Sequence, residues 1–257
     1  LMESSTFNIA GQPLEIAADS TLQMSAGTIH LDGAPITGAG TFLVSGGTLL
    51  VNADSAITSR FTLSGGTLAG AADFTIGNAF DWSGGTMAGD GRTVLAAGTM
   101  TTIGSASNYK FLHRRLDVAG TLTFSNSTNY DLYIRDGGTL HIASTGTLAT
   151  SANGFIYLNE SSNGTNNGSV VISADSGGRI AVADGTTLFL TADGAASNHL
   201  RGNFALSGPG AVQFNSGLFN VDQATTFSGS GVLRLNGGTL ATNAATQIAN
   251  FEMTGGT

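Results

Sequence analysis

Three segments of this 257-residue chain repeat almost the same eight residues at an interval of 19. Each segment begins with phenylalanine and contains Ser-Gly-Gly-Thr, and the segments are 42–49, 61–68 and 80–87. A regular internal period of this length is typical of solenoid proteins, in which each repeat buries its apolar face only against its neighbours. The period therefore predicts stacked coils of about 20 residues each.

Apolar and polar residues alternate within each repeat, as expected of strands with one buried face. In the second copy Phe61 and Leu63 share one parity, whereas Thr62 has the other. Aligning the copies gives three columns of inward-facing residues: Leu22, Phe42, Phe61 and Phe80; Met24, Val44, Leu63 and Trp82; and Ile29, Leu49, Leu68 and Met87. We expect each column to form a ladder inside the coils, with neighbouring strands about 4.8 Å apart.

A Gly-Gly pair separates the two strands of each copy and predicts a corner of the coil, because glycine tolerates a positive φ and needs no room for a Cβ atom. The chain has 38 glycines, and no glycine-free window sustains a helical period. The predicted fold class is all-β, a parallel β-helix (β-solenoid) with a right-handed coil, forming a single body over residues 1–257. An antiparallel sandwich is the weaker alternative, because a sandwich does not require a repeat of constant length.

The last residues, 251–257, stop at Gly-Gly-Thr where the repeat calls for leucine. Solenoid domains normally end in a capping segment with a polar outer face. We therefore expect this chain to be a segment excised from a longer repeat array. Exposed terminal strands would favour self-association.

Composition and charge argue against several functional classes. The net charge of -8 disfavours a nucleic-acid partner, which needs a basic surface. The chain has no cysteine, so it can form neither disulfides nor thiolate metal sites, and its four histidines show no ligand spacing. No stretch approaches the roughly 20 apolar residues of a membrane span. We expect no cofactor, no metal and no direct membrane span.

Residues 229–240, Gly-Ser-Gly-Val-Leu-Arg-Leu-Asn-Gly-Gly-Thr-Leu, resemble the autotransporter-associated β-strand repeats of bacterial passenger domains and, more widely, filamentous-haemagglutinin-type adhesins. The resemblance covers most of residues 20–100 and 200–257. It implies a secreted or cell-surface β-helix exported across the outer membrane, with a role in adhesion, aggregation or structural extension. The implied partners are a host or matrix glycan or a surface protein. No catalytic motif of these families is matched, so we expect no enzymatic activity.

The repeat pattern is broken most strongly between residues 109 and 135, which hold four of the nine basic residues and three of the four tyrosines. Tyrosine offers a flat surface to sugar rings, and arginine offers forked donors to carboxylate or sulfate groups. Arg135 follows Arg115 by one expected coil length, so we expect them to stack on one face of successive coils. The candidate ligand-binding strip, suited to an acidic polysaccharide, comprises Tyr109, Lys110, His113, Arg114, Arg115, Tyr133 and Arg135.

Other interpretations of this region stay open. The basic residues would otherwise form surface ion pairs worth about 0–1 kcal/mol each; their partners would be Asp117, Asp131 and Asp136. A β-helical polysaccharide lyase or glycoside hydrolase would instead need two carboxyl groups facing one bond, for which Asp117 and Asp136 are candidates. A purely structural stalk would bind nothing. The insert 159–168 is expected to be a loop that leaves the coil.

Overall fold

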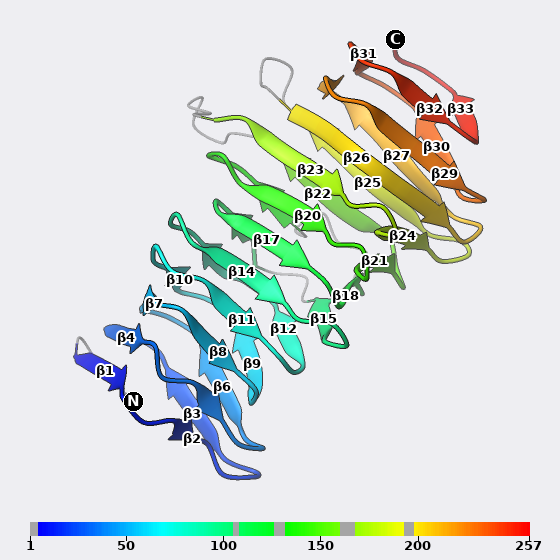
Figure 1. The fold of residues 1–257 in the computed structure, drawn as a ribbon. Helices are drawn as coiled ribbons and strands as arrows, with labels where there is room; N and C mark the ends of the chain where they lie inside the picture. Colours follow the sequence, from blue (N-terminus) through cyan, green and yellow to red (C-terminus); the bar gives the residue numbers. More distant parts are fainter. Residues whose placement is uncertain (1–4, 105–107, 126–131, 160–167, 193–197) are drawn as a thin grey trace.

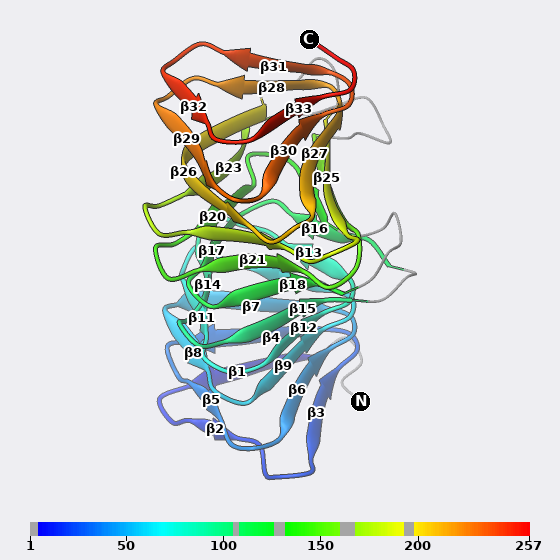
Figure 2. The same cartoon turned by 90° about the vertical axis from the view of Figure 1, so that its right-hand side faces the viewer.

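The chain folds into an elongated stack of strands, with β1–β3 at one end and β31–β33 at the other (Figures 1 and 2). The structure is a computed structural model that describes residues 5–104, 108–125, 132–159, 168–192 and 198–257. Most of the predicted insert, residues 160–167, lies outside these ranges. No helix occurs in the described part of the chain, and therefore none that could cross a membrane. The predicted all-β class and β-solenoid architecture are confirmed, with coils of roughly 22 residues.

Every pair of neighbouring strands along the stack is parallel, and the strands of successive coils form three faces. Face 1 is a 12-stranded sheet. Figure 2 labels several of its strands, β13, β16, β25 and β27, one above the other. Its strands are β1 (Thr6–Ala10), β4 (Thr28–Asp32), β7 (Thr48–Ala53), β10 (Thr67–Ala69), β13 (Gly85–Met87), β16 (Lys110–Leu112), β19 (Leu132–Ile134), β22 (Gly154–Leu158), β25 (Thr187–Ala192), β27 (Ala211–Ser216), β30 (Val232–Leu235) and β33 (Phe251–Met253).

Face 2 is seen in Figure 1, where β8, β11, β14, β17, β20 and β23 lie side by side. It consists of β2 (Leu14–Glu15), β5 (Ile36–Thr37), β8 (Ser55–Ile57), β11 (Phe74–Ile76), β14 (Arg92–Leu95), β17 (Arg115–Val118), β20 (Thr139–Ile142), β23 (Val170–Ala174), the first half of β26 (Asn198–Ser207), β28 (Leu218–Val221) and β31 (Thr239–Thr242).

Face 3 contains the strands that begin the repeated octapeptides. It consists of β3 (Thr21–Met24), β6 (Thr41–Val44), β9 (Arg60–Leu63), β12 (Phe80–Trp82), β15 (Met100–Ile103), β18 (Thr121–Phe124), β21 (Thr147–Thr150), β24 (Arg179–Val182), the second half of β26, β29 (Thr225–Gly229) and β32 (Thr246–Ile248). The long strand β26 continues from face 2 into face 3 without a break and so joins the two faces into one sheet.

The three predicted columns lie in register on adjacent coils, two on face 3 and one on face 1. Their side chains fill the interior. The ring centroid of Phe61 lies 5.9 Å from that of Phe42 and 5.0 Å from that of Phe80, and all three side chains are buried. The nearly constant period places an apolar residue at the same point of each coil, so apolar side chains stack on one another along the solenoid.

The second glycine of the Gly-Gly pair forms the predicted corner. Gly47 and Gly66 have φ values of 74° and 68°, in the left-handed region that favours glycine. A Cβ atom on Gly66 would lie 2.7 Å from the carbonyl carbon of Gly46 in the neighbouring coil. The corner therefore requires glycine both for its backbone conformation and for the close approach of neighbouring coils.

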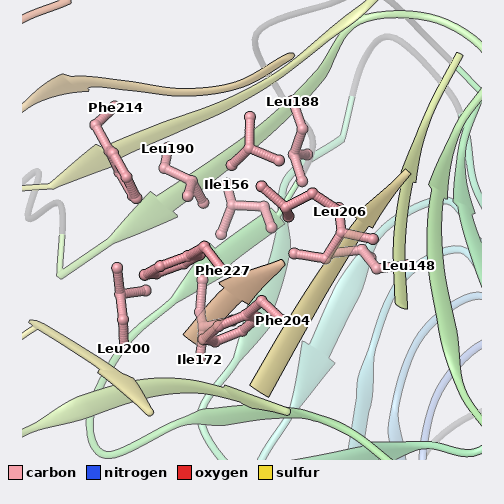
Figure 3. A pocket seen from close by; sticks show the side chains of 12 residues that line it. Leu148, Ile156, Ile172, Leu188, Leu190, Leu200, Phe204, Leu206, Phe214 and Phe227 are labelled. Atoms are coloured by element: carbon pink, nitrogen blue, oxygen red, sulfur yellow. The ribbon is translucent and has the colours of Figure 1, made fainter. Parts of the chain in front are cut away.

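The interior of the described coils is filled mainly by apolar side chains. A gap in its C-terminal half is a cavity of about 20 Å³ lined only by apolar side chains, Phe204, Phe214 and Phe227 among them (Figure 3). A space of this size holds about one water molecule, and an apolar lining gives that water no hydrogen-bond partner. Surfaces open to a larger ligand therefore lie on the outer faces of the coils.

Candidate functional site

The structure brings four of the seven predicted site residues together on the outer side of face 1. Tyr109 precedes β16, His113 follows it, Tyr133 lies in β19 and Arg135 follows β19. The four residues form one group around Phe111: its ring centroid is 5.8 Å from that of Tyr109, 5.6 Å from that of Tyr133 and 5.9 Å from that of His113.

Lys110 and Arg114 point into the solenoid, so their expected place in a surface strip is wrong. Lys110 is fully buried because it shares its parity with the buried Leu112, and its Nζ donates a hydrogen bond to the Asn108 carbonyl at 3.1 Å. Arg114 is also buried, at the corner between faces 1 and 2. Burial lowers the pKa of Arg114 to about 10, which leaves it charged at neutral pH.

Arg115 lies on face 2 and does not stack with Arg135, contrary to the prediction from their spacing. The coil that separates them is longer than the regular repeat: Leu112 pairs in register with Ile134, which places Arg135 beside His113. Arg115 instead forms an ion pair with Asp117, with 2.6 Å between Nε and Oδ1, as the surface ion-pair interpretation predicts.

The proposed pair of catalytic carboxyl groups is not formed. Asp117 pairs in register with His141 on face 2. Asp136 lies in the turn after β19, with a φ of 51°, and its Oδ2 is 3.5 Å from Nδ1 of His113. The two carboxyl groups therefore belong to different parts of the coil. The third acidic candidate, Asp131, lies outside the described residues.

Six aromatic residues form a continuous patch on the outer side of face 1, which we call the aromatic strip. Ring centroids are 4.6 Å apart for Tyr133 and Tyr157 and 4.7 Å apart for Phe155 and Phe189, with nearly parallel planes in both pairs. The members of the strip are Tyr109, Phe111, Tyr133, Phe155, Tyr157 and Phe189. Four of them were not predicted as site residues; the alternation of Phe111 with the inward-facing residues on either side of it is the signal that could have identified it.

Arg135 covers part of this strip. Its Cζ atom lies 5.0 Å from the ring centroids of both Phe111 and Tyr133, a distance at which the guanidinium is attracted to the rings. Its Nε atom is buried and has no hydrogen-bond partner among the described residues, and the same holds for Nε2 of His113. Burial lowers the pKa of His113, against the opposing influence of the Asp136 carboxylate.

A second polar surface, the charged groove, crosses the outer side of face 2. It consists of two adjoining open grooves that share Arg115 and His141. At one end Arg92 pairs with Asp73 at 2.5 Å and with Asp117 at 3.3 Å. The hydrogen bond from Arg92 lowers the pKa of Asp73. The groove is defined by the side chains of Asp73, Arg92, Arg115, Asp117, His141, Ser173, Asp175 and Arg201.

In the part of the chain that the structure describes, no group of three or more histidine, aspartate or glutamate side chains is placed to hold a metal ion. The chain matches none of the protein-family models, curated protein sequences or solved structures with which it was compared. The two outer surfaces are thus the basis for assigning a function.

Proposed function

We propose that this protein is a secreted or cell-surface β-solenoid segment of a bacterial adhesin, and that the aromatic strip binds its ligand. The observation that supports the proposal is a change of residue type along one outward column of face 1. Thr48, Thr67 and Thr86 occupy this column in successive coils. The next three coils carry aromatic residues at the same position, Phe111, Tyr133 and Tyr157.

The change is not required by the fold. Threonine has high strand propensity and hydrogen-bonds to water, so it suits an outward position of a parallel sheet. Phe111 and Tyr157 at these positions are half-buried and keep some apolar area facing solvent, whereas Tyr133 between them is only 7% exposed. Exposed apolar patches commonly mark interaction sites. Tyr109 is 46% exposed and is the member of the strip most open to a ligand.

The chemistry of the strip suits an acidic glycan. Because Tyr133 and Tyr157 stack on each other, the two ring faces in contact are closed to a ligand. The guanidinium of Arg135 supplies forked donors to a carboxylate or sulfate group, and the ring of Tyr109 supplies an apolar surface for a sugar. A structural stalk remains the competing proposal, because stacked rings also stabilise neighbouring coils.

Binding to polysaccharides tests the proposal. The chain would be immobilised and exposed to dextran sulfate, polygalacturonate and neutral dextran at two salt concentrations, beside the variants Arg135→Ala and Tyr109→Ala. We expect binding of an acidic polymer that weakens with salt and with each variant. Arg115→Ala, which removes the same charge from face 2 instead of face 1, is the matched control and should bind as the parent does.

Two results would contradict the proposal. Equal loss of binding in Arg115→Ala and Arg135→Ala would show that general charge is responsible, and not the strip. Absence of binding to all three polymers, together with lowered thermal stability of Tyr109→Ala, would favour the stalk.

A further inference from the structure

Three side chains in the charged groove form a connected series that runs from a carboxylate through an imidazole to a hydroxyl. Ser173 in β23 pairs in register with His141 in β20, and its Oγ lies 2.9 Å from Nδ1 of His141. On the other side of the ring, Nε2 of His141 lies 3.4 Å from Oδ2 of Asp175.

We propose that Ser173, His141 and Asp175 form a hydrolytic site for carboxylic esters. A serine hydroxyl becomes a nucleophile when a neighbouring base accepts its proton and a third group orients that base. When the proton of the neutral ring is on Nε2, Nδ1 accepts from the Ser173 hydroxyl at 2.9 Å. The Nε2 atom then faces the Asp175 carboxylate at 3.4 Å, within ion-pair distance of the group that would orient the ring. The order of roles is that of a catalytic triad, which is recognised by geometry and not by sequence position.

The surroundings of the series differ from those of an ordinary surface hydrogen bond. The side chain of His141 is 14% exposed, whereas that of Asp175 is 54% exposed, so the base is shielded while the site stays open to solvent. Arg201 pairs in register with Ser173 and lines the same groove, and Asp222 holds its guanidinium in place at 3.0 Å. Arg201 therefore contributes an ion-paired positive charge to the lining of the groove that holds Ser173.

The shape of the groove indicates the class of substrate. The groove is open and shallow and extends across several coils, from Asp54 in one direction to Gln223 in the other. Such an open surface encloses no small molecule, but it can accommodate a stretch of an extended polymer. We assign the site to acyl esters carried on a polysaccharide chain, with the polymer lying across the strands of face 2.

The reaction balances with water alone. Ser173 Oγ attacks the ester carbonyl carbon while its proton moves to Nδ1 of His141. The ester C–O bond then breaks, and the same proton goes to the departing sugar oxygen. Water attacks the acyl-serine with His141 again as base, which releases the carboxylic acid and restores the serine hydroxyl. The net change is ester plus water to acid plus alcohol.

Hydrolysis of p-nitrophenyl acetate and of acetylated xylan by the full chain tests this site. Ser173→Ala and His141→Asn should each lower kcat/KM by about 100-fold or more, the usual contribution of a nucleophile–base pair. His30→Ala is the matched control for background catalysis by imidazole, because His30 is a surface histidine whose Nδ1 contacts Asn52 and not a hydroxyl. It should retain the parent activity.

Covalent labelling provides a second readout that does not depend on the choice of substrate. A fluorophosphonate should attach to Ser173, as located by peptide mass spectrometry, and labelling should be lost in His141→Asn but not in His30→Ala. Hydrolysis that persists in Ser173→Ala, or the absence of both hydrolysis and labelling in a folded parent chain, would overturn the proposal. Because Ser173 and His141 lie on face 2, the outcome of the hydrolysis and labelling assays does not depend on whether the aromatic strip on face 1 binds a ligand.

Discussion

The Nε atom of Arg114 donates a hydrogen bond to the carbonyl oxygen of Gly91 at 2.7 Å, from inside a corner of the solenoid. Its Nη1 and Nη2 atoms donate to the carbonyl oxygens of Ala88 at 3.3 Å and Ala72 at 3.1 Å. One buried guanidinium therefore connects the corners of three successive coils. A charge removed from water is costly unless hydrogen bonds compensate it, and these three carbonyls provide that compensation.

Replacement of Arg114 by methionine should lower the free energy of unfolding by about 2–5 kcal/mol, because one buried and two part-buried carbonyl oxygens lose their donor at once. Urea unfolding followed by the fluorescence of Trp82, the single tryptophan and fully buried, measures the change. Arg115→Met is the control. Arg115 forms a surface ion pair with Asp117, so its loss should cost no more than about 1 kcal/mol. Equal costs for the two variants would refute a structural role of Arg114.

The corner glycines can be tested with two positions that share a positive φ but differ in crowding. Gly66 has a φ of 68°, and a Cβ atom there would lie 2.7 Å from backbone atoms of Gly46 and Gly47. Gly98 has a φ of 83° and no atom within 4 Å of such a Cβ. Gly98→Ala should cost about 1–2 kcal/mol for the left-handed conformation alone.

Gly66→Ala should cost clearly more, about 2–5 kcal/mol, because the neighbouring corner must also move. The comparison of urea midpoints isolates the effect of crowding. Similar midpoints would mean that the coils can separate at the corner without penalty.

The sequence predicts the fold well wherever the period is constant. In the coils around Phe61 the interval hardly changes, so counting along the chain places each inward residue correctly, and Phe42, Phe61 and Phe80 do stack. The prediction requires only that like residues recur at a fixed interval. The same reasoning identifies the Gly-Gly corners, because a residue without a side chain is needed at the same point of every coil.

The site is predicted less well because coil length changes. Between Arg115 and Ser173 the coils are longer than the regular repeat: Asp117 pairs with His141, and His141 pairs with Ser173 across a still longer interval. Counting by a constant repeat therefore paired Arg115 with Arg135 incorrectly. Ser173 and His141 lie on either side of the 159–168 insert in the sequence. Their contact therefore cannot be predicted from a regular spacing.

The phenylalanine ladder should carry much of the stability of the N-terminal coils. Phe61 is fully buried between two other rings, so Phe61→Ala should lower the free energy of unfolding by about 3–5 kcal/mol. Tyr109→Ala removes a ring that is 46% exposed and should cost about 0.5–1.5 kcal/mol, the usual value of one aromatic contact. Chemical unfolding of both variants provides the test, and a smaller loss in Phe61→Ala than in Tyr109→Ala would contradict it.

The stability of the protein should depend on His113 below neutral pH. Burial lowers the pKa of His113 in the folded state, whereas the unfolded chain keeps a pKa near 6.5. At pH values between these two pKa values the unfolded state binds more protons than the folded state. The stability contributed by neutral His113 is therefore fully present above about pH 6.5, and it is lost as the pH falls toward the folded-state pKa. His113→Phe should therefore lose less stability than the parent between about pH 7.5 and pH 5, as measured by urea midpoints at the two values.

Asp136→Asn should change the pH dependence in the opposite direction. The Asp136 carboxylate favours the charged ring, so its removal lowers the folded-state pKa of His113 further and extends the window of lost stability to lower pH. The variant should therefore lose more stability than the parent over the same pH interval. Parallel pH profiles for the parent, His113→Phe and Asp136→Asn would show that His113 does not contribute to the acid sensitivity.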